Sequence, residues 1–286
     1  MDAILLCMKK SGIRFFGKIK FPNTDIVRFH AKKQFMELLK TKIKNFDNVL
    51  IMAHGSKNAI LTTTTNPAQK YAVYISSEDT FVFKNDFVFA VSCLTAHEFG
   101  KSCIDNGAIA YLGFQVEFGS LFSSYSKKNS VLPKRVSTAI DTIIKHIFIE
   151  ELSRSYEEFL TTPINVRTLK ERFSFLLEKR IAALTSLTPK EFYEQYGVKF
   201  SDRDYKQFVV NLVLRVLSCL NEILDHLVCL GDENYISSSY ISYKIHSGVN
   251  RDQLLKELES LSAFQNISNI MYKQYLREII LKEGSE

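Results

Sequence analysis

The stretch "FDNVLIMAHGSK", residues 46–57, has the pattern of a buried strand that stops at a His-Gly pair. A second stretch, "DFVFAVSCLTAHEFG", residues 86–100, has the same form and stops at Ser-Cys. Short apolar runs rich in Val, Ile and Phe are typical of strands that are buried on both faces of a sheet. His54 and Cys93, which can both do acid–base or nucleophilic chemistry, therefore each follow a buried strand.

Other segments of the first half alternate between strand and helix patterns. Helical spacing or turn signals mark residues 25–46 and 95–107, the second closed by Asn106-Gly107. Alternating strands and helices predict an α/β fold with a mainly parallel sheet flanked by helices. Further strands are expected at residues 2–8, 59–65, 71–77 and 108–114.

From about residue 131 the pattern becomes helical throughout. "SLTPKEFYEQYG" carries a helix-start signature, with Thr188 as N-cap, Pro189 in the first turn and Glu191 three residues after the cap. We therefore predict two domains, an α/β domain over 1–130 and an all-helical accessory domain over 131–286, joined by a mobile loop at 113–133. Helices are expected at residues 134–161, 165–186, 188–196, 202–230, 250–262 and 266–282.

The composition is that of a globular protein, with 46% hydrophobic and 24% charged residues in 286. The net charge of +6 arises in residues 1–130, where scattered lysines favour a solvated helix face over a nucleic-acid contact. The most apolar long segment, 208–230, contains Arg215 and Asp225, which favours an amphipathic core helix over a membrane span. The N-terminal apolar run is too short for a signal peptide. These patterns predict a cytoplasmic protein without membrane contact.

Five cysteines are widely spaced and include no CxxC pair, which favours a reducing compartment and argues against a disulfide framework or a structural zinc site. A metal site of Cys93, His97 and His54 is conceivable, but it lacks a fourth ligand, so we predict no metal or other cofactor. Cysteines in apolar strand or helix patterns are interpreted as core residues: Cys7, Cys103, Cys219 and Cys229.

The two strand ends together predict a catalytic pair. Carboxyl ends of neighbouring parallel strands meet at one edge, about 4.8 Å apart, so His54 and Cys93 are expected to face one another. The imidazole would act as base and the thiol as nucleophile. A helix expected to begin near Leu94 or Thr95 would lower the thiol pKa, and the amides of Gly55 and Cys93 would form an oxyanion hole.

"MAHGS" followed by "FAVSCLTAHEFGKSCIDNGAIAYLGF" resembles the caspase-like (clan CD) cysteine peptidases, and especially their CHAT branch. The resemblance covers roughly residues 1–120 and implies a caspase-like sheet with His54 as base and Cys93 as nucleophile. The Gln-Ala-Cys-x-Gly pattern of caspases is replaced by Val-Ser-Cys-Leu-Thr at 91–95. Aspartate specificity is therefore not implied.

The expected function is a cysteine endopeptidase that cleaves a protein substrate without a cofactor. The resemblance extends this to a regulated protease of a prokaryotic immune, antiviral or cell-death system, with a regulatory protein docking on the helical half. The strands within residues 55–85 are expected to project beside the cleft, with Thr62 to Thr65 exposed, and to influence specificity. The alternative is a non-catalytic interaction scaffold that keeps the fold and has no reactive thiol.

Overall fold

The chain divides into two compact units in this computed structural model. Unit 1 consists of Met1–Gln115, Ser153–Lys170 and Leu227–Glu286, and unit 2 of Val116–Leu152 and Glu171–His226. These units do not coincide with the division at residue 130, because the C-terminal segment groups with the sheet. The structure describes residues 3–7, 24–27, 48–63, 71–117, 134–197 and 202–282. The predicted loop therefore lies mostly outside the described residues.

Unit 1 is built on a six-stranded sheet with the order β2-β1-β3-β7-β8-β9. The first five strands are parallel, and β9 runs antiparallel to β8 at the edge. This is the mainly parallel sheet that the alternating pattern predicts. The strands are β1 (Ala3–Cys7), β2 (Thr24–Val27), β3 (Asn48–Met52), β7 (Phe87–Val91), β8 (Ala110–Phe114) and β9 (Leu227–Gly231).

Two expectations for these strands are wrong. The helical half is not all helical, because its run Leu227–Gly231, predicted as the end of a helix, pairs with β8. A short apolar run has no periodicity that distinguishes a strand from a helix. Here it forms a strand because it pairs with β8, whose backbone groups would otherwise be unpaired on that side. The helix predicted from residue 25 is also wrong at its start, since Thr24–Val27 forms β2. Residues 28–46 lie outside the described part of the chain.

Both faces of the central strands are buried, as their continuous apolar runs predict. Along β7, Val88 and Ala90 face a core that includes Phe99 of α2 (Glu98–Asp105). The alternate residues Phe87 and Phe89 face the other way and contact Phe159 and Tyr156, with ring centroids 5.1 and 6.0 Å apart. Helical residues therefore cover each face of the sheet.

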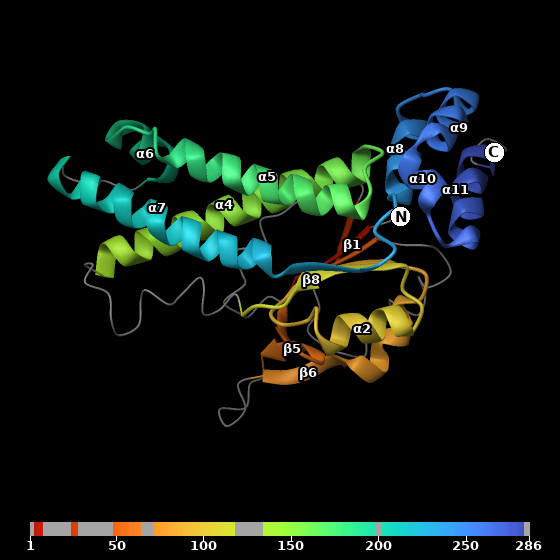
Figure 1. Cartoon of the computed structure of the whole chain (residues 1–286), viewed down its shortest axis with the longest axis horizontal. Helices are drawn as coiled ribbons and strands as arrows, with labels where there is room; N and C mark the ends of the chain where they lie inside the picture. Colours follow the sequence, from red (N-terminus) through yellow and green to blue (C-terminus); the bar gives the residue numbers. More distant parts are fainter. Residues whose placement is uncertain are drawn as a thin grey trace. The chain divides into compact units, whose positions relative to one another are not determined.

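The excursion between β3 and β7 forms a separate three-stranded antiparallel sheet, named here the small sheet. It consists of β4 (His54–Ser56), β5 (Ala59–Thr63) and β6 (Tyr71–Ser76), followed by the 3-10 helix η2 (Ser77–Phe83). Figure 1 shows the small sheet and α2 on the same side of the main sheet.

The small sheet lies outside the main sheet, as expected, but it does not only project. Ile60, Tyr74 and Ile75 are buried in the same core cluster as Phe99. The expected exposure of the threonines is wrong for Thr62, which is half-buried. The side chains of the other three lie outside the described part.

The N-terminal edge of the parallel strands carries a dense polar network. Asn48, fully buried at the start of β3, donates from Nδ2 to the hydroxyls of Ser237 and Ser239, at 3.0 and 3.1 Å. Its Oδ1 accepts from the Tyr235 hydroxyl at 3.0 Å. The Tyr235 ring stacks on Tyr272 with centroids 4.6 Å apart. This network holds residues 235–239, which follow β9, against the first residue of β3.

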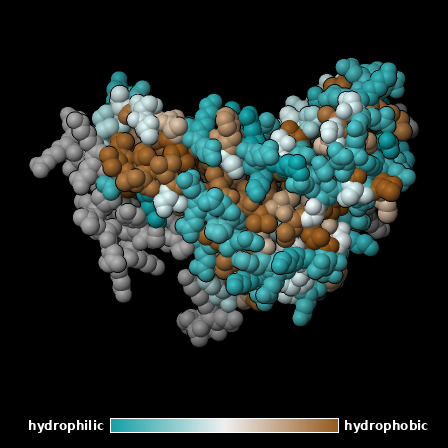
Figure 2. Space-filling model, viewed as in Figure 1, coloured by the Kyte–Doolittle hydropathy of each residue, from teal (hydrophilic) through white to brown (hydrophobic). Residues whose placement is uncertain are grey.

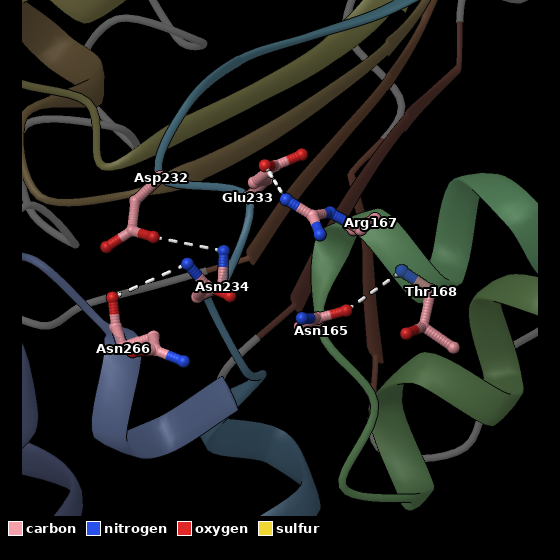
Figure 3. A network of polar contacts seen from close by, with 7 residues as sticks. All are labelled: Asn165, Arg167, Thr168, Asp232, Glu233, Asn234 and Asn266. Atoms are coloured by element: carbon pink, nitrogen blue, oxygen red, sulfur yellow. Dashed lines mark hydrogen bonds and ion pairs between the residues drawn. The ribbon is translucent and has the colours of Figure 1, made fainter. Parts of the chain in front are cut away.

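The same segment is tied to the turn before α5 (Val166–Leu184), as Figure 3 shows. Arg167 pairs with Glu233. Asp232 accepts from the Asn234 amide at 3.0 Å, and Asn234 in turn donates to the Asn266 carbonyl at 3.4 Å. The N-terminal edge is therefore closed by polar contacts as well as by packing.

The remaining helices of unit 1 follow this segment. In Figure 1 they gather beside the C-terminus, and α11 packs against α8 and α9. Leu254, Leu258 and Leu276 supply part of their buried apolar surface. They are α8 (Ser238–His246), α9 (Arg251–Ser260), α10 (Ser262–Asn266) and α11 (Ile270–Lys282).

Unit 2 is helical among its described residues. The predicted start of α6 is confirmed: Thr188 Oγ1 accepts from the Glu191 amide at 3.3 Å, and the Glu191 carboxylate accepts from the Thr188 amide at 2.8 Å. Gly197 ends α6 in a left-handed conformation. The helices are α4 (Lys134–Thr161) and α5, which are shared with unit 1, with α6 (Pro189–Tyr196) and α7 (Asp202–Asp225).

Apolar residues are exposed along one face of α7. Val210, Leu214 and Leu217, spaced at helical intervals, are 59%, 62% and 37% exposed, and Figure 2 shows hydrophobic surface over this helix. No helix in the described ranges combines the length and apolarity that a membrane crossing requires.

Candidate active site

His54 and Cys93 follow neighbouring strands of the main sheet. β3 and β7 pair in parallel, with Met52 opposite Val91, and the Ala53 amide donates to the Val91 carbonyl at 3.4 Å. The two strands therefore end side by side at the carboxyl edge of the sheet. Ligands of open α/β sheets bind where the strand order reverses, which here is between β1 and β3, one position away from the pair β3 and β7.

Gly55 brings the His54 segment directly against the Cys93 segment. A Cβ atom placed on Gly55 would lie 2.4 Å from Ser92 Oγ, 2.5 Å from the Cys93 carbonyl oxygen and 2.6 Å from Thr95 Cγ2. Side chains do not approach other atoms so closely, so only glycine fits here. The His-Gly motif thus provides close backbone contact between the two strand ends.

Cys93 lies in a tight turn. Leu94 has a φ of 61°, and only Asn85 shares a positive φ among the described non-glycine residues. A left-handed conformation costs a branched side chain on the order of 1 kcal/mol. The turn is held by hydrogen bonds from the Ala96 amide to the Phe114 carbonyl, at 3.1 Å, and from Thr95 Oγ1 to the Ser92 carbonyl, at 3.1 Å.

The expected helix start beside Cys93 is wrong. α2 begins at Glu98, with His97 at its N-cap position. Its first turn is already satisfied, because the Phe99 amide donates to the Lys57 carbonyl and the Gly100 amide to the Thr95 carbonyl, both at 2.8 Å. The helix N-terminus therefore lies several residues beyond Cys93 in sequence, and two of its amides already have partners. Because the helix begins only at Glu98, His97 does not share a helix face with Cys93.

His54 begins β4 instead of ending β3, and its backbone pairs with Leu61. Its ring lies against Tyr71 of β6, with centroids 4.7 Å apart and planes tilted by 52°. This contact was not predicted, because in the sequence Tyr71 is only one residue of an expected strand. The pairing of the small sheet brings the two rings together.

The Gly55 amide points away from β5. Only two residues separate Ser56 from its partner Ala59, so this pair must exchange backbone hydrogen bonds. Antiparallel pairs alternate, and His54 with Leu61 is therefore the next hydrogen-bonded pair. Gly55 lies between them, and its N–H is directed to the outer side of β4. This N–H is therefore not used in the pairing with β5.

The Ser92 hydroxyl, next to Cys93, was not among the predicted site residues. Ser92 is fully buried, and its Oγ has no hydrogen-bond partner among the described residues. A buried hydroxyl without a partner costs about 1–3 kcal/mol of desolvation. The carboxyl edge therefore contains an unpaired polar group and an unfavourable backbone conformation next to each other.

Of the other described cysteines, two are fully buried, and the third, Cys229, is partly exposed like Cys93. Cys103 and Cys219 are fully buried, as predicted, and burial raises the pKa of Cys103 well above its usual value. The prediction that Cys229 is a core residue in a helix is wrong, because it lies in the edge strand β9 and is partly exposed, although burial still raises its pKa to about 12. Cys93 is half-exposed. None of these four residues is in a disulfide.

The described residues include no set of side chains that could bind a metal ion. No three His, Cys, Asp or Glu residues gather there in a way that would hold a metal ion. Asp86 is buried at the start of β7, at the opposite end of the strand from Cys93. The groups at the carboxyl edge that could do acid–base or nucleophilic chemistry include the His54 imidazole and the Cys93 thiol, with the Ser92 and Thr95 hydroxyls beside them.

Comparisons with known proteins do not assign a family. No family model matches the chain, and no curated protein matches it significantly.

Proposed function

We propose that this protein is a cysteine endopeptidase in which His54 and Cys93 form the catalytic dyad. The observation that carries the proposal is the contact between the two strand ends. Gly55 packs against the Ser92–Cys93 backbone, so the residues on either side of this contact belong to one site. The resemblance to caspase-like peptidases assigns the same two residues to base and nucleophile.

In the proposed reaction, the His54 imidazole takes the proton of the Cys93 thiol, and the thiolate attacks the carbonyl carbon of a peptide bond. The Gly55 and Cys93 amides stabilise the oxyanion that forms. The C–N bond then breaks, and the imidazolium gives its proton to the departing amine. A water molecule, deprotonated by His54, releases the acyl group from sulfur and regenerates the thiol.

The strained turn supports this role for Cys93. Unfavourable backbone conformations persist where the surrounding structure enforces them, and they concentrate at functional sites. Here the Ala96 amide and the Thr95 hydroxyl hold the turn around Leu94. The thiol is thereby presented at the end of a buried strand on a rigid support.

The test is hydrolysis of a peptide library by the purified chain. Wild type should cleave a subset of peptides, and Cys93→Ala and His54→Ala should each lose activity by orders of magnitude at unchanged melting temperature. Cys229→Ala serves as the matched control and should retain activity. Because the two residues act as a unit, the double variant should be no worse than either single variant. Additive losses, or equal cleavage by Cys93→Ala, would refute the dyad.

An absence of cleavage by every variant, together with equal labelling of all accessible thiols, would favour the scaffold interpretation. In that case Cys93 is a small residue at a strand end, and His54 a structural partner of Tyr71.

A further inference from the structure

The His54 and Tyr71 rings belong to one face of the small sheet. His54 pairs with Leu61 on β5, and Thr63, two residues further along β5, pairs with Tyr71 on β6. Residues directly opposite one another, and residues two apart on a strand, share a face. The ring contact at 4.7 Å agrees with this register. The contact therefore follows from the pairing of three strands.

We propose that Tyr71 is a positioning residue for His54, which holds the imidazole in place and stabilises the imidazolium. This inference rests on the proposed dyad. Aromatic rings at this separation attract one another, and the face of a tyrosine ring attracts a cation within about 6 Å. In the dyad, His54 becomes a cation when it accepts the thiol proton. Tyr71 then favours the charged pair over the neutral one.

The other described side chains of this face cannot supply such a contact. Leu61 and Val73 are aliphatic, and Val73 is 53% exposed. Tyr71 is half-buried, and its strand continues into Tyr74 and Ile75, which are buried in the core. Tyr71 therefore belongs to a strand whose other residues pack into the core. His54 is the first residue of the three-residue strand β4, and the contact with Tyr71 restricts the orientation of its imidazole.

The experiment compares Tyr71→Phe, which keeps the ring, with Tyr71→Leu, which removes it. Two quantities are measured in the full chain at neutral pH: the rate of Cys93 alkylation by iodoacetamide, from peptide mapping, and the NMR shifts of the His54 ring protons. Tyr71→Leu should slow alkylation by roughly fivefold, the value of an exposed cation–π contact, and move the His54 shifts. Tyr71→Phe should retain both values. Val73→Ala, on the same face, is the matched control and should also retain both.

The outcomes separate this inference from the proposed function. If His54→Ala slows alkylation of Cys93 but Tyr71→Leu does not, the dyad stands and the role of Tyr71 is refuted. If Tyr71→Leu accelerates alkylation, the contact restrains His54 instead of positioning it, and the inference is equally wrong. If His54→Ala leaves alkylation unchanged, both proposals fall. A loss in Tyr71→Leu that Tyr71→Phe does not rescue would mean that the phenol hydroxyl acts and the ring does not.

Discussion

The two edges of the main sheet are built differently, although β3 connects them over only five residues. At the N-terminal edge the buried Asn48 side chain makes three hydrogen bonds, to Tyr235, Ser237 and Ser239. At the carboxyl edge the equally buried Ser92 hydroxyl makes none among the described residues. The adjoining Leu94 has a left-handed backbone.

This difference indicates where polar contacts stabilise the fold and where they do not. Satisfied polar groups at one edge add to stability, whereas unpaired groups and backbone strain at the other subtract from it. Natural sequences depart from favourable backbone geometry and complete hydrogen bonding mainly at functional sites. Asn85, just before β7 at the N-terminal edge, also has a positive φ, but asparagine tolerates this conformation better than leucine does, so the carboxyl edge, which holds His54 and Cys93, departs further.

The largest effect is expected from Asn48→Ala, which breaks the N-terminal network. Three hydrogen bonds at about 1 kcal/mol each are lost, so the free energy of unfolding should fall by about 3 kcal/mol. Chemical denaturation measures this loss. Alkylation of Cys93 in the folded variant should not change, because the site lies at the other edge. A loss well below 1 kcal/mol would remove the contrast between the edges.

A matched pair of serines sharpens the comparison. Ser237 and Ser92 are both fully buried, but Ser237 accepts from Asn48 at 3.0 Å and from the Ser239 amide at 3.2 Å. Ser237→Ala should cost about 1–2 kcal/mol of unfolding free energy. Ser92→Ala removes an unpaired hydroxyl and should be neutral to within about 0.5 kcal/mol, or stabilising. Equal losses in the two variants would show that Ser92 is satisfied in solution.

The smallest effect concerns the backbone of the Cys93 turn. Glycine adopts positive φ without cost, whereas alanine does not, so Leu94→Gly should be about 1 kcal/mol more stable than Leu94→Ala. Both variants lose the same side-chain contacts beyond Cβ, so their difference isolates the backbone. Thermal unfolding of the two proteins gives this value. A more stable alanine variant would mean that the turn is not left-handed.

Much of the sheet could be predicted from sequence, because strands such as β3 (Asn48–Met52) and β7 (Phe87–Val91) consist almost entirely of apolar residues and have turn residues after them. The strand β9 could not, since "LVCLG" is equally compatible with the end of a buried helix. Its conformation depends on pairing with β8, a strand more than 100 residues earlier in the chain that has no other partner on that side among the described strands.

The candidate site was only partly predictable. His54, Gly55 and Cys93 stand out because each follows a strand, and the structure brings their segments together. The helix start near Leu94 was wrong, because the positive φ of this residue diverts the chain before α2 begins. The Tyr71 contact depends on the register of three strands, which no local pattern specifies.

The most direct test of the account compares alkylation of two half-exposed cysteines, Cys93 and Cys229, by iodoacetamide at neutral pH. Burial raises the pKa of Cys229 to about 12, so its thiol is almost entirely protonated and should react slowly. If His54 takes the proton of Cys93, Cys93 should react at least about a hundredfold faster than Cys229, and His54→Ala should slow Cys93 by at least about tenfold while the rate of Cys229 stays the same. Similar rates for the two cysteines, or a fast Cys93 that is indifferent to His54→Ala, would contradict the proposed dyad.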